Sequence, residues 1–285
     1  MLVGLCRQLI SDQKLDQFSQ VFGSYNYFCS EVRGELNMLW EKEVEICTRA
    51  GVMQGFAAAP ADGVPAPAII FYMDAPGYRE ELRNMARRIA KAGYFCILPD
   101  MYYRMGTLRF NLLQRNEDMT RVIFAAMDHL SNAMVVEDTS CILSWLDGQG
   151  LAKAGPVGCV GHCMSGRYIT TVAAKFPTRI KAAGSLYGVG IITDHADSPH
   201  LLLPEIQGEL YYAFAEIDQH VPENIIPDLK DALAKTKIKY SVEVYKNTQH
   251  GFCFPERSAY APEAAEATWA HLFEMWERQL KQPNK

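Results

Sequence analysis

From about residue 38 onward, hydrophobic and polar positions along the chain alternate between two patterns. Short, almost wholly apolar runs predict buried strands, and longer segments with apolar residues three and four positions apart predict helices. The expected strands are the apolar runs 68–73, 94–100, 156–161, 181–188 and 209–215, together with the alternating segments 39–48 and 240–245. The expected helices are 79–93, 164–176, 222–235 and about 262–280, with one or two more within 117–147.

The order of these elements predicts the fold class. Strands and helices follow one another in turn, which is typical of an α/β protein with a mostly parallel central sheet and helices on both faces. In such sheets, the side chains that bind or react gather at the carboxyl ends of the strands. Reactive residues that directly follow a predicted strand are therefore the first candidates for a functional site.

Residues 1–37 differ from the rest of the chain. They mix polar and aromatic residues, as in Q-F-S-Q-V-F-G-S-Y-N-Y-F-C-S, without a clear helical or strand period. We expect residues 1–37 to form a poorly packed N-terminal extension, and residues 38–285 to form a single α/β domain. A short docking segment is the alternative interpretation of the extension.

Composition narrows the class of partners. The 285 residues are 49% hydrophobic and 21% charged, with a formal net charge of −5 and no basic patch, so we expect no nucleic-acid partner. No run approaches the roughly 18 apolar residues of a membrane span. Polar Arg7 and Gln8 come too early for a secretory signal. Eight scattered cysteines without a C-x-x-C pair predict a reduced, cytoplasmic protein without a structural zinc site.

The segment V-G-H-C-M-S-G, residues 160–166, carries the most specific signal. Cys163 follows a predicted strand and precedes a predicted helix, with Gly161 two residues before it and Ser165 two residues after it. This spacing matches the G-x-S-x-G nucleophile elbow, in which small residues allow a sharp strand-to-helix turn. Taken alone, Cys163 also fits a buried structural thiol. Whether it is a nucleophile depends on whether the chain also supplies a base and an acid for it.

Two more reactive residues follow strands further along the chain. Asp218 comes after strand 209–215 and His250 after strand 240–245, which gives the chain order nucleophile, acid, base. In such a triad the histidine takes the thiol proton and the carboxylate fixes the imidazole tautomer. Two nearby residues are alternatives for the triad, Ser165 as nucleophile and Glu216 as the orienting acid. Two nearby histidines are expected to have no catalytic role: His162 as a packing residue and His220 as a solvated loop residue.

At this point the chain resembles the dienelactone hydrolase family, over roughly residues 45–280. The resemblance rests on five segments, which are M-D-A-P-G at 73–77, A-G-Y-F-C-I-L-P-D-M-Y-Y-R at 92–104, the cysteine elbow, A-E-I-D-Q-H-V-P at 215–222 and H-G-F at 250–252. It implies the α/β-hydrolase fold, hydrolysis of lactones or esters through a cysteine acyl-enzyme, and no metal or organic cofactor.

The resemblance also implies roles for individual residues. Cys163 becomes the nucleophile, Asp218 the orienting acid and His250 the base, and the backbone N–H groups of Met164 and Ala75 form the oxyanion hole. Family members carry a glutamate that is thought to interact with the resting cysteine. Asp74, one methylene shorter, stands at that place in this sequence and is a candidate auxiliary residue.

Substrate contacts are less well defined. The family has an arginine just after the H-x-F segment, where this chain has Phe254, with Arg257 nearby. Arg104 and Arg109 are other possible contacts for an anion. The expected substrate-binding residues are the side chains that follow two of the predicted strands, namely Tyr102, Tyr103, Arg104, Phe252 and Phe254. Such a pocket suits a small ester or lactone.

Three other functions remain open from the sequence. The same triad could serve an acyltransferase or a thioesterase, which a long acyl tunnel or a second nucleophile would distinguish. Cys163 could instead be a peroxide-sensitive thiol, which would need a resolving cysteine such as Cys159. A non-catalytic binding protein on a hydrolase scaffold is the third possibility, because a fold and a motif do not prove turnover.

Overall fold

The computed structural model describes residues 38–282, so the expected extension at 1–37 lies outside the described residues. Eight strands form one sheet in the order β1-β2-β4-β3-β5-β6-β7-β8. Strands β1 and β2 form an antiparallel hairpin, β2 joins β4 antiparallel, and every following pair is parallel. The strands are β1 (Leu39–Thr48), β2 (Gly51–Pro60), β3 (Ala66–Tyr72), β4 (Phe95–Pro99), β5 (Ala152–His162), β6 (Ile180–Leu186), β7 (Glu209–Ile217) and β8 (Tyr240–Gln249).

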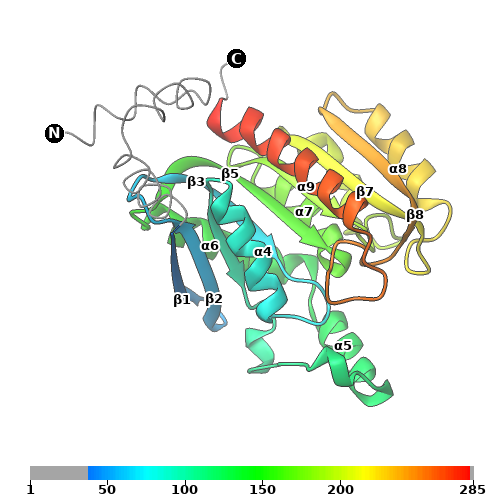
Figure 1. The fold of residues 1–285 in the computed structure, drawn as a ribbon. Helices are drawn as coiled ribbons and strands as arrows, with labels where there is room; N and C mark the ends of the chain where they lie inside the picture. The colour runs from blue at the N-terminus through cyan, green and yellow to red at the C-terminus, as the bar shows by residue number, and fades with distance from the viewer. Residues whose placement is uncertain (1–37, 283–285) are drawn as a thin grey trace, which may run out of the picture.

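Helices cover both faces of this sheet. The α-helices are α4 (Glu80–Lys91), α5 (Glu117–His129), α6 (Asn132–Asp147), α7 (Gly166–Lys175), α8 (Ile225–Ala234) and α9 (Pro262–Trp276). Helices α4 and α9 lie side by side on one face, where Arg88 and Glu266 join them, and α6 and α7 lie on the other (Figure 1). This confirms the expected α/β fold, a mostly parallel sheet with helices on both faces. No helix in residues 38–282 is long and apolar enough to cross a membrane.

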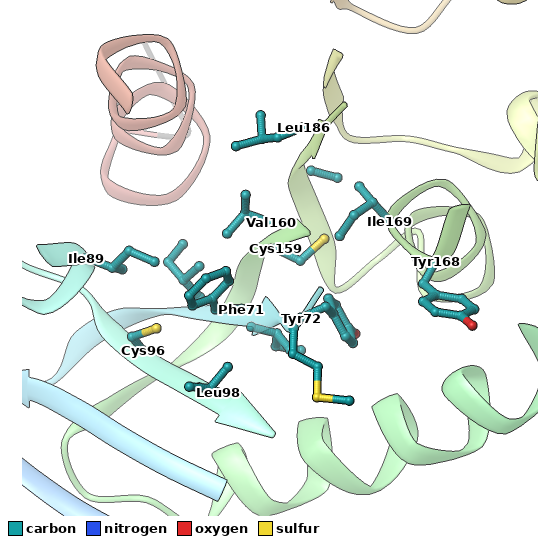
Figure 2. Packing of buried hydrophobic residues seen from close by; sticks show 14 of the residues in the cluster. Phe71, Tyr72, Ile89, Cys96, Leu98, Cys159, Val160, Tyr168, Ile169 and Leu186 are labelled. Carbon is teal, nitrogen blue, oxygen red and sulfur yellow. The ribbon is translucent and has the colours of Figure 1, made fainter. Parts of the chain in front are cut away.

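The apolar core lies on both sides of the central strands. Every residue of β3 is buried, because helices cover both faces of the sheet there. Figure 2 shows the packing between these strands and the helices, with Ile89 from α4 and Tyr168 and Ile169 from α7. Close packing of this kind holds the strand ends in fixed relative positions.

Strand β2 was not among the expected strands. Its sequence, G-V-M-Q-G-F-A-A-A-P, has no sustained alternation and contains two glycines and three alanines, which are weak strand formers. Ten consecutive residues nevertheless pair with β1, and four pair with β4 on the other side. The strand therefore owes its conformation to its two neighbours rather than to local preference.

The segment 117–147, where one or two helices were expected, contains two. Asn116 caps α5 by accepting a hydrogen bond from the Met119 N–H, and Ser131 caps α6 by accepting one from the Met134 N–H. A short polar side chain that satisfies a free N–H group is the usual start signal of a helix. The cap at Ser131 thus separates the two helices.

Candidate active site

Three side chains meet at the edge of the sheet where three parallel strands end. Cys163, Asp218 and His250 each directly follow the last residue of β5, β7 and β8. His250 Nδ1 lies 2.7 Å from Asp218 Oδ2, and Cys163 and His250 line the same pocket. The structure therefore brings together the three residues that the sequence nominated as a triad.

Cys163 occupies a strained turn. Its φ of +53° lies in the left-handed region, which non-glycine residues adopt rarely and mostly at functional sites. The turn needs small neighbours. A Cβ atom added to Gly161 would lie 2.8 Å from Ser165 Cβ, and one added to Gly166 would lie 2.1 Å from Gly188 Cα. Gly166 therefore allows the start of α7 to approach Gly188 closely. The small residue Ser165 does the same for the approach to Gly161.

Ser165 is not placed as a nucleophile. Its side chain is fully buried, and its Oγ donates a hydrogen bond to the carbonyl oxygen of Met73, the first residue after β3. The hydroxyl thus ties the elbow to the loop after β3.

Both oxygens of Asp218 are held. Oδ2 accepts the hydrogen bond from His250 Nδ1, and Oδ1 accepts one of 2.9 Å from the His220 backbone N–H. Glu216, the other candidate acid, bonds instead to Lys246 Nζ and to the Asn247 N–H, each at 2.7 Å. Asp218 is therefore the carboxylate that orients the imidazole.

The His250 ring is packed on two sides and leaves one nitrogen free. Tyr187 and His220 contact it edge to face, with ring centroids 5.1 and 4.7 Å away. Nε2 is buried and has no hydrogen-bond partner within residues 38–282. Burial lowers the pKa of His250, but the Asp218 carboxylate and the neighbouring Cys163 side chain outweigh it and raise the pKa to about 9.

This raised pKa predicts an alkaline limit on turnover. In the cysteine mechanism expected from the sequence, imidazolium protonates an alkoxide leaving group after the attack, and raising the pH through about 9 removes that proton. We expect kcat/KM for an alkyl ester to fall with a midpoint near pH 9. A p-nitrophenyl ester is the matched control, because p-nitrophenolate leaves without a proton. Equal losses for both esters, or no loss for the alkyl ester, would contradict the assignment of His250 as the acid.

Asp74 lies two residues beyond the end of β3 and carries no exposed surface. Arg79 binds its carboxylate with two nitrogens, at 2.5 and 3.2 Å, and Arg257 Nη2 binds the second oxygen. Burial raises the pKa of Asp74, but the two guanidinium groups outweigh this and lower the pKa overall. The carboxylate is thus engaged with two arginines, and Arg257 connects it to the pocket.

Met164 and Ala75, the expected oxyanion-hole residues, lie next to the nucleophile. Met164 directly follows Cys163, and Ala75 lines the pocket. The hydroxyl of the fully buried Tyr102 donates a 2.8 Å hydrogen bond to the Ala75 carbonyl oxygen and lies 3.4 Å from Met164 Sδ. The Tyr102 hydroxyl therefore contacts both of the segments that are expected to form the oxyanion hole.

The pocket above Cys163 has a volume of about 290 Å³. Ligand pockets for drug-sized molecules start at about 300 Å³, so this one suits a small substrate. Most of its wall is apolar, and its polar lining comes from nitrogen-bearing side chains and the thiol. The lining residues are Ala75, Pro76, Arg115, Ile123, Phe124, Met127, Cys163, Val189, His220, His250 and Arg257. No group of three metal-ligating side chains occurs in the described part of the chain.

Comparison with known proteins settles the family. A family model described as "Dienelactone hydrolase family" matches residues 53–280. The chain belongs to the dienelactone hydrolase family. As a member, it is a hydrolase that acts on lactone or carboxylic ester bonds, and its fold is the α/β-hydrolase fold.

Individual relatives agree with this family. A protein named "Putative carboxymethylenebutenolidase" from Methylorubrum extorquens is 27% identical over 248 residues, which cover 86% of this chain and 83% of the relative. A protein of the same name from Synechocystis sp. is 27% identical over 231 residues, 80% of this chain and 92% of the relative. The crystal structure of "Putative Dienelactone Hydrolase from Klebsiella pneumoniae" superposes with a TM-score of 0.76 at 23% identity, covering 85% of this chain and 99% of that one.

The residues expected to contact substrate do not line the pocket of this dienelactone hydrolase family member. Tyr103 Oη donates a 2.7 Å hydrogen bond to Asp138, and the Arg104 guanidinium pairs with Asp138 and Glu137. The Tyr102 hydroxyl bonds to the Ala75 carbonyl oxygen, as described above. Tyr103 and Arg104 are thus bonded to carboxylates of α6, and Tyr102 to the loop after β3.

Phe252 and Phe254, which were also expected to contact the substrate, do not line the pocket either. Both are fully buried. Phe254 packs against the His162 ring, with centroids 5.0 Å apart, and the Arg79 and Arg257 guanidinium groups lie over its face at 5.1 and 4.4 Å. Phe254 therefore packs against the two arginines that bind Asp74. Arg257, three residues after Phe254, lines the pocket.

His162 and His220, the two histidines set aside in the sequence, have different surroundings. His162 is fully buried, and burial lowers its pKa to about 3, so the ring is neutral and packs among Phe71, Tyr187 and Phe254. His220 lines the pocket beside His250 and is not merely a solvated loop residue.

Proposed function

We propose that this chain cleaves a small lactone or carboxylic ester through a thioester on Cys163, with His250 as base and Asp218 as its orienting acid. One observation carries the proposal. In a single pocket, the carboxylate fixes Nδ1 of His250, while buried Nε2 has no other partner in the described residues and Cys163 stands on a strained turn beside it. This is the arrangement that activates a nucleophile.

The reaction proceeds in two halves. His250 Nε2 takes the thiol proton, and Cys163 Sγ attacks the carbonyl carbon. The N–H groups of Met164 and Ala75 stabilise the tetrahedral oxyanion, an effect worth about 3–4 kcal/mol per donor. The intermediate expels the alkoxide, which takes the proton from His250 and leaves a thioester. Water then gives a proton to His250 and attacks the thioester, which releases the carboxylic acid and returns the proton to Sγ.

Two cationic side chains suit an anionic group on the substrate. Arg257 lines the pocket while it is paired with Asp74. Arg115 also lines the pocket, and its side-chain hydrogen bond within residues 38–282 goes to the neutral Thr120 hydroxyl at 3.1 Å. We place an acidic substituent of the substrate near Arg115, because a guanidinium group without a protein carboxylate is free to bind one.

The other candidate functions find less support. A volume of about 290 Å³ leaves little room for the long acyl chain of a typical thioesterase or acyltransferase substrate. Cys159, the nearest cysteine in sequence, is fully buried on β5, and burial raises its pKa, which suppresses the thiolate that disulfide exchange requires.

The direct test is the covalent intermediate. We expect acid quenching during turnover of p-nitrophenyl acetate to leave an acetyl group on the peptide that contains Cys163, detected by mass spectrometry. Cys47, an exposed thiol, is the internal control for uncatalysed acetylation. Rapid turnover with acetyl on another residue, or with label on Cys47 and Cys163 alike, would refute the proposal.

A further inference from the structure

Helix α5 belongs to a segment that projects from the body of the molecule beside the strand ends (Figure 1). The segment runs from Gly106, which has a φ of +91°, to Leu130, between β4 and α6. At one end, Arg109 pairs with the buried Asp100 at 2.7 Å. At the other, the Leu130 carbonyl oxygen accepts hydrogen bonds from Tyr168 and Arg167. The segment is thus anchored at its two ends and free to present its middle to the pocket.

The helix turns one face toward Cys163. Ile123, Phe124 and Met127 line the pocket, at positions that share a side of an α-helix. Ile123 is buried, but Phe124 keeps 38% of its surface exposed. On other faces, Val122 is 48% exposed and Arg121 pairs with Asp118 in solvent. The pocket-facing side of α5 is therefore a hydrocarbon wall with an incompletely covered aromatic ring.

The two sides of the pocket differ in chemistry. Cys163, His220 and His250 form the reactive side, and Arg257 and Arg115 supply positive charge. The α5 wall offers neither a charge nor a hydrogen-bonding side chain among its three lining residues. A substrate that fills this space would place its reacting carbonyl at Cys163 and an apolar substituent against α5.

We propose that α5 is the specificity element of this hydrolase and that the substrate carries an aryl or branched alkyl group beside the scissile carbonyl. The inference rests on the proposed function, because it takes Cys163 as the reacting centre. Burying the ring of Phe124 under such a group removes apolar surface from water, which favours binding. A methylene-sized difference in an apolar pocket changes kcat/KM by about tenfold or more.

The kinetic test compares two p-nitrophenyl esters, the phenylacetate and the acetate. We expect wild type to prefer the phenylacetate ester, and Phe124→Ala to lower the phenylacetate-to-acetate ratio of kcat/KM by about tenfold. Val122→Ala, on another face of the same helix, is the matched control and should keep the wild-type ratio. An unchanged ratio in Phe124→Ala would overturn the inference while leaving the proposed function intact.

A binding measurement keeps the inference testable without turnover. In the Cys163→Ala protein, calorimetric titration with phenylacetate should show tighter binding than titration with acetate. Adding Phe124→Leu, a change that keeps the site apolar, should weaken phenylacetate binding. If wild type hydrolyses neither ester, the proposed function fails, and Phe124-dependent binding of phenylacetate would still support the α5 site. Equal binding of phenylacetate and acetate would overturn it.

Discussion

Replacing Cys163 by alanine is expected to lower kcat/KM for p-nitrophenyl acetate by about 10⁴-fold or more, because removal of a nucleophile leaves only substrate binding and the oxyanion hole. The geometry supports so large an effect. Cys163 stands on the strained turn after β5, in the same pocket as His250, whose Nε2 has no hydrogen-bond partner among residues 38–282. Steady-state kinetics on the purified variant would measure the loss, and circular dichroism would confirm that it is folded.

Ser165→Ala is the matched control for this experiment. Ser165 is two residues away and fully buried, and its hydroxyl bonds to the Met73 carbonyl oxygen rather than facing the pocket. We expect this variant to retain most activity and to lose about 1 kcal/mol of unfolding free energy with the hydrogen bond. An inactive Ser165→Ala protein beside an active Cys163→Ala protein would show that the nucleophile has been misassigned.

Asp74→Ala should destabilise the fold by about 3–5 kcal/mol, the usual cost of leaving a buried charge without its partner. Asp74 is fully buried between Arg79 and Arg257, and only 9% of the Arg79 side chain is exposed. Because its pKa is lowered in the fold, the carboxylate stabilises the protein above its ordinary pKa of 3.8, and this contribution is lost as the pH falls through the lowered value. Urea unfolding at neutral pH would measure the change.

Asp118→Ala is the surface control for this second prediction. It removes an ion pair with Arg121 whose side chains are 82% and 73% exposed, and such pairs contribute about 0–1 kcal/mol. A loss below about 1 kcal/mol for Asp74→Ala, similar to the surface control, would show that the two arginines reorient toward solvent at little cost.

Much of the fold could be predicted because the central strands are buried on both faces. Such strands appear in the sequence as continuous apolar runs, and the residues after them fall at one edge of the sheet. That rule placed Cys163, Asp218 and His250 together from sequence alone, although their catalytic roles remain a prediction. Strand β2 escaped the same rule because its small residues form a strand only through pairing with β1 and β4.

The pocket wall could not be predicted for a different reason. Arg257 meets Asp74 across 183 positions of the sequence, and α5 reaches Cys163 from the segment between β4 and α6. Neither contact has a local pattern, because it depends on the path of connecting segments rather than on strand ends. The same uncertainty explains why Tyr103 and Arg104 were expected at the pocket, whereas they pair with Asp138 on α6.

Attachment of the segment 106–130 at its two ends also bears on how such an enzyme can diversify. Insertions, deletions and replacements between Gly106 and Leu130 would reshape the apolar wall without passing through any strand of the sheet or any member of the triad. Random libraries at the exposed codons of this segment, with buried Ile123, Ala126 and Leu130 kept, should therefore yield new ester preferences at a low rate of misfolding. On the proposed roles of the triad and α5, the residues that react and the residues that select the substrate lie in separate segments of the chain and can change independently.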